Sequence, residues 1–394
     1  MRSIEANLDS LPLLHTLPES YRLLCFDGLR GICSVIIVAG HLLTYWVPVE
    51  DEAFAARFPF LALEYLTEVS LFFLISGFTL VHVYDPTGDA FAFDSRVFFW
   101  KRAGRLLPVY YLSLFISLPA LLVYHDIFAI ITSIVFSVLC LQSLSVVGND
   151  LNGPLWQVSS FVICYLSFPR LLRRLRTLST SILLFLLGAL YLLPVLCMIL
   201  WLKNLGLGSF IIMHISTWSR LPQFIIGMGT ALVARRVPLK SPSVIADSVS
   251  CLLLINKLAC TLLMERARPD FGFWFFYMYV CEYALVPLQA LWLSALANPS
   301  CGGLTVALLT TRPVLFLGRI SYTVYCLHWP LIIWIGWAFK GIIPQRNLYG
   351  LVGWFAFPPL AIMPILLVVL CIAALVCWLI EEPSRRAIEA QMLK

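Results

Sequence analysis

Charged side chains are scarce in this chain. Only 12% of its 394 residues are Asp, Glu, Lys or Arg, and 61% are hydrophobic, whereas a soluble globular protein has about 25% charged residues. A water-soluble fold cannot hide so much apolar surface, because most of its exterior must be wetted. The composition therefore excludes a soluble globular protein and predicts an all-α polytopic transmembrane helix bundle without a separate soluble domain.

Several binding and catalytic motifs are also missing. The chain has no Walker loop and no Gly-x-Gly-x-x-Gly after a strand, so nothing in it indicates nucleotide hydrolysis or a Rossmann cofactor site. Its twelve cysteines include no Cys-x-x-Cys pair, and no His/Cys cluster has metal-ligand spacing, so we expect neither a metal nor a bound cofactor. The net charge of +6 is spread over loops, which argues against nucleic-acid binding.

Long apolar runs are what the chain has in abundance. Eleven runs are bounded by charges or turn residues: 26–47, 66–84, 106–124, 128–147, 155–169, 181–202, 211–234, 244–264, 273–296, 315–339 and 355–380. Eleven crossings would place the Arg-rich stretch 170–176 outside, against the positive-inside rule. With a single crossing between 128 and 169, the cytoplasmic segments hold 19 Lys and Arg and the opposite side holds 6. We therefore predict about ten spans with both termini cytoplasmic.

We assign the disputed crossing to the helix that starts near Trp156. The run 128–147 would then be re-entrant or interfacial on the far side, and the reverse assignment stays open. The first 25 residues are too polar for a secretory signal, so the first apolar segment is expected to be an uncleaved anchor. The predicted layout is a cytoplasmic segment 1–25, an integral-membrane domain 26–386 and a cytoplasmic tail 387–394.

Ionisable groups at membrane depth are costly, and the first span contains two. Arg30 and His41 are eleven residues apart, which is within about 20° of a whole number of helical turns. They therefore share one helix face, about 16 Å apart along the axis, and Asp27 precedes them in the same segment. They form a functional site, or else His41 is a packing histidine and Arg30 an anchor that snorkels; periodicity alone favours neither.

A second basic group precedes the third span. Arg102 and Arg105, at i and i+3, point the same way, and their forked guanidiniums suit a phosphate or diphosphate. Taken alone, such a juxtamembrane pair more often only sets the orientation of the helix in the membrane.

A polar stripe enters a late span from the same side as the first histidine. Ser321, Tyr325 and His328, at i, i+4 and i+7, lie on one face of an otherwise apolar helix. The stripe either joins helices by hydrogen bonds or, with His41, lines a shared polar cavity.

Two smaller features concern packing. The Ser76-Gly77 step in the second span allows close approach by a helix or a ligand. Glu282 and Lys257, in two later spans, could pair between adjacent helices, which would give both a structural reason.

These segments, in this order, resemble acyltransferase family three, the acyl-CoA-dependent membrane O-acyltransferases of carbohydrates and other hydroxylated acceptors. The matching motifs are Asp27-Gly28-Leu29-Arg30-Gly31 with Arg30-x10-His41, Phe72-Phe73-x-x-Ser76-Gly77-Phe78, Arg102-x-x-Arg105-x-x-Pro108, Asn152-Gly153-Pro154-Leu155-Trp156, Arg220-x-Pro222-x-Phe224-x-x-Gly227-Met228, Gly318-x-x-x-Tyr322-x-x-Tyr325-x-x-His328-x-Pro330 and Glu382-Pro383-x-Arg385. The resemblance implies ten helices with cytoplasmic ends, a cytoplasmic acyl-CoA donor and an essential histidine, His41. It also implicates the arginines Arg30, Arg102 and Arg105 in donor binding or site integrity.

The chain departs from the family at one position. The family commonly carries a Glu after the tryptophan of the fifth segment, but no acid follows Trp156 as far as Val162. If that carboxylate orients the acceptor or the histidine, this chain uses another group or a different acceptor. The further candidates for the cavity or the acceptor site are Asp27, Ser76, Trp156, Ser321, Tyr325 and His328.

We therefore expect a multi-pass membrane O-acyltransferase. It would move an acyl group, most simply acetyl, from acyl-CoA as co-substrate to a hydroxyl of a carbohydrate, lipid or natural product. His41 would act as general base on that hydroxyl or accept the acyl group transiently, while the arginines hold the coenzyme A phosphates. Two alternatives are a secondary transporter with a buried His/Arg site, although no internal repeat supports it, and a non-catalytic acyltransferase-like membrane protein.

Overall fold

The computed structural model describes residues 19–46, 66–85, 93–119, 127–144, 151–205, 214, 216–266, 283–340, 346–347, 350–351 and 359–392. Most of these residues are helical, which confirms the all-α membrane bundle. The helices are α2 Glu19–Trp46, α4 Leu66–Tyr84, α5 Ser95–Ser117, α6 Ile127–Val138, α7 Trp156–Leu175, α8 Thr180–Leu205, α10 Thr217–Arg236, α11 Pro242–Arg266, α13 Val286–Leu296, α14 Gly303–Leu309, α15 Arg312–Lys340, α16 Pro359–Val376 and α17 Glu382–Met392. The short elements are the 3₁₀ turns η2 Gln142–Leu144 and η3 Gly153–Leu155, the π-helical turn η5 Cys377–Glu381, and the paired strands β1 Arg346–Asn347 and β2 Gly350–Leu351.

Six helical segments among the described residues are long and apolar enough to cross a membrane. The bent pair α14 and α15, with an angle of 61° between them, makes a possible seventh. Stretches such as 267–282 lie outside the described residues, so the ten spans and the cytoplasmic termini stay predictions. Helix α6 has 12 residues, about 18 Å of helix, which is too short for a core of about 30 Å. The segment 153–175 is long enough, in agreement with the crossing assigned to the helix near Trp156.

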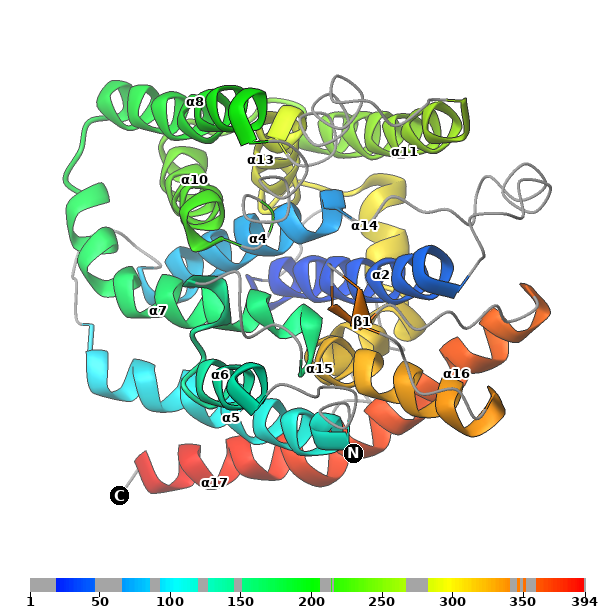
Figure 1. Cartoon of the computed structure of the whole chain (residues 1–394). Coiled ribbons are helices and arrows are strands. Elements are labelled where there is room, and N and C mark those ends of the chain that lie inside the picture. The colour runs from blue at the N-terminus through cyan, green and yellow to red at the C-terminus, as the bar shows by residue number, and fades with distance from the viewer. Residues whose placement is uncertain are drawn as a thin grey trace.

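Helices α2 and α15 are parallel and touch backbone to backbone. A Cβ on Gly31 would lie 2.4 Å from the backbone nitrogen of Gly318, and a Cβ on Gly318 would lie 2.2 Å from the carbonyl oxygen of Asp27. Only glycine permits this approach. In Figure 1, α2 crosses the middle of the bundle with α4 and α15 beside it, and the contacts between these helices agree.

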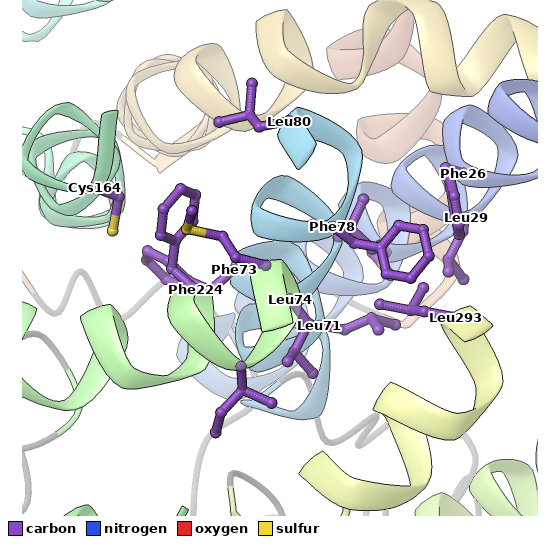
Figure 2. Packing of buried hydrophobic residues seen from close by; sticks show 14 of the residues in the cluster. Phe26, Leu29, Leu71, Phe73, Leu74, Phe78, Leu80, Cys164, Phe224 and Leu293 are labelled. Carbon is purple, nitrogen blue, oxygen red and sulfur yellow. The ribbon is translucent and has the colours of Figure 1, made fainter. Parts of the chain in front are cut away.

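Helices α4 and α10 make a second glycine contact. A Cβ on Gly77 would lie 2.1 Å from the carbonyl oxygen of Phe224, so the close approach predicted at the Ser76-Gly77 step is made by a helix. Figure 2 shows Phe78 of α4 facing α2, and its ring centroid lies 5.3 Å from that of Phe26. Helix α4 is therefore packed against both α2 and α10.

The outermost helices turn apolar side chains away from the bundle. In Figure 1, α8 and α11 lie together along one edge, and side chains such as Phe185 and Leu254 are exposed by 80% and 68%. Such surfaces suit a lipid environment. A buried ion pair ties α11 to α4, because Lys257 Nζ lies 2.9 Å from Glu68 Oε1. Glu282, the carboxylate suggested for Lys257, lies outside the described residues, so that pairing stays a prediction.

Three helix ends meet at a buried carboxylate. Asp85, just after α4, is 3% exposed. Its Oδ1 lies 3.7 Å from Nη2 of Arg176, just after α7, and its Oδ2 lies 3.5 Å from Nη1 of Arg235 in the last turn of α10. The ten-span topology places all three helix ends on the cytoplasmic side. The helix α17 packs against α5, where a Cβ on Gly104 would lie 2.4 Å from Ile388 Cδ1.

Candidate active site

A cavity of about 250 Å³ lies between α2, α4, α5, α7 and α15. The residues that line it are Asp27, Arg30, Phe72, Ser76, Thr79, Leu80, Val83, Arg102, Arg105, Leu106, Gln157, Val158, Phe161, Tyr165, Ser321, Tyr322 and Tyr325. Seven of the ten residues singled out in the sequence are among them: Asp27, Arg30, Ser76, Arg102, Arg105, Ser321 and Tyr325. The tertiary fold thus brings together groups from four separate sequence segments, in α2, α4, α5 and α15.

Arg30 of α2 is held from two directions. Its Nη1 donates to Asp27 Oδ1 at 2.6 Å, one turn earlier on the same helix, and its Nη2 donates to Thr79 Oγ1 of α4 at 2.9 Å. The Thr79 hydroxyl in turn donates to the Ile75 carbonyl at 2.6 Å, which leaves its oxygen lone pairs for the guanidinium. The guanidinium is therefore fixed at the wall of the cavity before any ligand enters.

Arg102 is held mainly by aromatic rings. Its guanidinium carbon lies 5.8 Å from the Tyr84 ring centroid, 5.7 Å from that of Phe98 and 6.0 Å from that of Tyr165, and its Nη2 donates to the Tyr84 hydroxyl at 3.4 Å. Cation–π contacts stabilise the charge without supplying an anion. Within the part of the chain that the structure describes, Arg105 has no ion pair and no side-chain hydrogen bond.

The charge balance of the cavity favours an anionic ligand. Three guanidiniums line it together with one carboxylate, Asp27, and that carboxylate is already paired with Arg30. Among the described residues, the walls therefore carry two positive charges that no lining carboxylate balances. Forked guanidiniums arranged in this way match the oxygens of phosphate groups.

Another part of the cavity wall is polar but uncharged. Gln157 of α7 and Ser321 of α15 lie there, and the Ser76 hydroxyl lies 3.1 Å from the Tyr165 hydroxyl. Gln157 is 2% exposed, and its Oε1 has no hydrogen-bond partner among the described residues. This carboxamide directly follows Trp156 and lies in the stretch, up to Val162, in which the sequence lacks the Glu expected from the resemblance.

The two histidines form a pair beside the cavity. His41 Nδ1 of α2 lies 3.1 Å from His328 Nε2 of α15, and the rings stack with centroids 5.0 Å apart. Neither ring lines the cavity. The Tyr325 ring, which does, lies 5.8 Å from His328, and its hydroxyl donates to the Pro154 carbonyl. Tyr325 thus both lines the cavity and contacts the histidine pair.

Trp156 lies in a different polar cluster. Its ring is under the guanidinium of Arg220 at 5.5 Å and meets the His214 ring at 5.0 Å. Arg220 is fully buried and donates through Nε to the His214 carbonyl at 2.8 Å and through Nη1 to Gln223 at 3.2 Å. The hydrogen bonds hold Arg220 at the start of α10, and its cation–π contact with Trp156 joins that end of α10 to α7.

Sequence reasoning passed over several cavity residues. Thr79 and Tyr165 are isolated polar residues in apolar helices, and nothing in their spacing distinguishes them. Tyr322 belongs to a matched motif but was not assigned to the cavity. Gln157 had a usable signal, since it adjoins Trp156 in a matched segment. Among the described residues, no group of three or more His, Cys, Asp or Glu side chains is placed to hold a metal ion.

Taken together, the fold and the cavity define a polytopic membrane protein with an arginine-lined cavity next to a histidine pair. The family model described as an acyltransferase domain matches residues 23–381. The chain therefore belongs to acyltransferase family three, a family of membrane-bound acyltransferases.

One curated relative matches the chain over a shorter stretch. It is "Protein 2 in picA locus" from Rhizobium radiobacter, which is 37% identical over 97 residues, or 25% of this chain. The match covers 44% of that relative's own length. No solved structure matches the chain significantly.

Proposed function

We propose that this membrane protein transfers an acyl group, most simply acetyl, from cytoplasmic acyl-CoA to a hydroxyl of a carbohydrate, lipid or natural product. The observation that carries the proposal is the cavity in which Arg30, Arg102 and Arg105 converge with only one carboxylate among the described residues that line it. Coenzyme A carries phosphates at one end and a thioester at the other. A cationic cavity beside a buried imidazole pair suits both ends of such a donor.

The size of the cavity decides which part of the donor it holds. About 250 Å³ is below the usual range of roughly 300–1,000 Å³ for small-molecule pockets, so a whole coenzyme A does not fit inside. The phosphates would contact the arginines at the mouth, while the narrow pantetheine arm extends inward along Gln157 and Tyr325. A shift of the Tyr325 ring would then open the remaining path to the histidines.

The proposed reaction needs one basic nitrogen. As the acceptor oxygen bonds to the thioester carbonyl carbon, His41 removes the hydroxyl proton, and the carbon–sulfur bond then breaks. The proton passes to the departing thiolate, which leaves as free coenzyme A. If His41 instead takes the acyl group first, the acceptor hydroxyl attacks the acyl-imidazole in a second step. Either course exchanges a thioester for an oxygen ester and needs neither ATP nor a metal.

Labelled acetyl-CoA supplied to membranes that contain the protein tests this function. We expect label to enter an organic-extractable or polysaccharide product, and the labelled product also reveals the acceptor. His41→Ala should abolish the transfer while its membrane content stays at the parental level. Lys101→Ala is a matched control, because Lys101 is exposed on α5 and does not line the cavity.

Two outcomes would contradict the proposal. If His41→Ala transfers label at the parental rate, the histidine has no part in the chemistry. If the parental protein binds coenzyme A but transfers nothing to any acceptor fraction, the non-catalytic alternative is favoured. The family assignment already favours an acyltransferase over the transporter alternative.

A further inference from the structure

We propose that His328 is a positioning residue that fixes the tautomer of His41, so that Nε2 of His41 is its basic nitrogen. The proposal deepens the function proposed above and rests on it where catalysis is concerned. The position of the proton on the His41 ring can be measured without any enzymatic turnover.

The hydrogen-bond partners of His328 determine which of its nitrogens carries the proton. Its Nδ1 lies 2.7 Å from the Tyr325 carbonyl oxygen and 3.3 Å from the Val324 carbonyl oxygen, both on its own helix. A carbonyl oxygen can only accept, so Nδ1 must be the protonated nitrogen. In a neutral ring, Nε2 of His328 is then an acceptor.

The same reasoning applies to the ring of His41. His41 Nδ1 lies 3.1 Å from His328 Nε2, and an acceptor at that position requires a donor opposite. His41 Nδ1 must therefore carry the proton, which leaves Nε2 as the unprotonated nitrogen of the neutral imidazole. Two backbone carbonyls thus set the protonation pattern of a side chain on another helix.

The packing around the pair holds this arrangement in place. His328 is fully buried, and its ring is stacked on His41 with an interplanar angle of 24°. Trp329 meets the His41 ring edge-on at a centroid distance of 5.7 Å. The backbone contact between α2 and α15 at Gly31 and Gly318 fixes the register that brings the rings together.

The arrangement has a direct chemical consequence. Whether His41 removes the acceptor proton or takes the acyl group, the nitrogen that reacts must have a lone pair. When Nε2 gains a proton, the positive charge of the ring is stabilised by the hydrogen bond from Nδ1 to His328 Nε2. His328 acts in the same sense as the carboxylate that orients a catalytic histidine in a hydrolase triad.

Two amide substitutions separate the two hydrogen bonds of His328. In His328→Gln, the longer amide oxygen reaches the place of Nε2 and can still accept from His41. In His328→Asn, the shorter amide replaces Nδ1 at the backbone carbonyls and leaves His41 without that acceptor. We expect His328→Asn to lower kcat by about 100- to 1,000-fold with the KM for acetyl-CoA within about twofold, and His328→Gln to keep at least a tenth of the parental kcat.

Nitrogen NMR of the protein labelled with ¹⁵N-histidine measures the tautomer directly. The signals of His41 are identified by their loss in His41→Ala. We expect a protonated Nδ1 and an unprotonated Nε2 in the parental protein and in His328→Gln, and a shift toward the Nε2-protonated form in His328→Asn. Titration with coenzyme A checks that both variants still bind the donor.

Each result bears on one claim. A parental His41 that is protonated at Nε2 overturns the inference, whatever the activity. Equal losses of kcat in both amide variants with intact donor binding, or full activity in His328→Asn, overturn it as well. If the parental tautomer is as expected but no acyl transfer occurs, the proposed function fails and the tautomer assignment survives.

Discussion

Removing the Arg105 guanidinium should weaken the binding of coenzyme A without weakening the binding of pantetheine. Arg105 lines the cavity and, among the described residues, has neither an ion pair nor a side-chain hydrogen bond. Its replacement by Ala therefore breaks no protein contact of that kind. The whole loss of affinity should come from its contact with a phosphate of the donor.

The expected magnitude follows from the type of bond. A hydrogen bond to a charged group contributes about 1.5–3 kcal/mol, which corresponds to roughly a 10- to 150-fold increase in the Kd of coenzyme A. Arg105→Lys should recover only part of this loss, because an ammonium keeps the charge but not the forked pair of donors. Pantetheine has no phosphate, so its weaker Kd should stay within about twofold in both variants.

Calorimetric titration of the detergent-purified protein measures both Kd values without an acceptor or turnover. Lys101→Ala controls for the general loss of a positive charge on α5, since this side chain is exposed and outside the cavity. An equal loss for coenzyme A and pantetheine would refute the reasoning, because it would mean that Arg105 shapes the cavity rather than contacting phosphate. A loss of similar size in Lys101→Ala would show that the charge acts only at long range.

Three other substitutions test neighbouring parts of the structure. Lys257→Met should lower the free energy of unfolding by about 3–5 kcal/mol, since it leaves Glu68 as an unpaired buried charge. Adding Glu68→Leu should restore most of the thermal midpoint measured in detergent. No recovery in the double variant would contradict this account. Gly31→Leu should prevent α2 from packing against Gly318 and abolish the monodisperse peak in size-exclusion chromatography, so a normal peak would contradict the glycine contact. Gln157→Glu should weaken coenzyme A binding, because a new carboxylate in the cavity wall repels the phosphates of the donor. A Kd that falls in this variant would count against an anionic ligand.

Local features of the sequence predicted most of the helices. Apolar runs gave the approximate positions of α2, α4, α8 and α11, because the membrane imposes a length and a composition on each crossing helix. The ends of the helices differ from the ends of the apolar runs. Helix α5 begins at Ser95, well before the apolar run that starts at residue 106, because Asp94 accepts from the amides of residues 96 and 97 and caps the helix. A cap is a local signal, but a hydropathy pattern does not register it.

The site was predictable in its parts and not in its assembly. The periodicity of α2 placed Arg30 and His41 on one face, and the stripe of α15 placed Ser321 and Tyr325 beside each other. Neither pattern shows that Arg30 lines the cavity, whereas His41 lies outside its lining and contacts His328.

The sequence by itself determined the class of protein, the approximate helices and the family, because low charge, long apolar runs and ordered motifs are all local properties. Only the tertiary structure decided that His41 meets His328, 287 residues away, and that Lys257 pairs with Glu68. Such contacts depend on which helices are neighbours and in what register. The glycines at which the backbones touch set that register, and a glycine carries no side chain by which the sequence could indicate its partner.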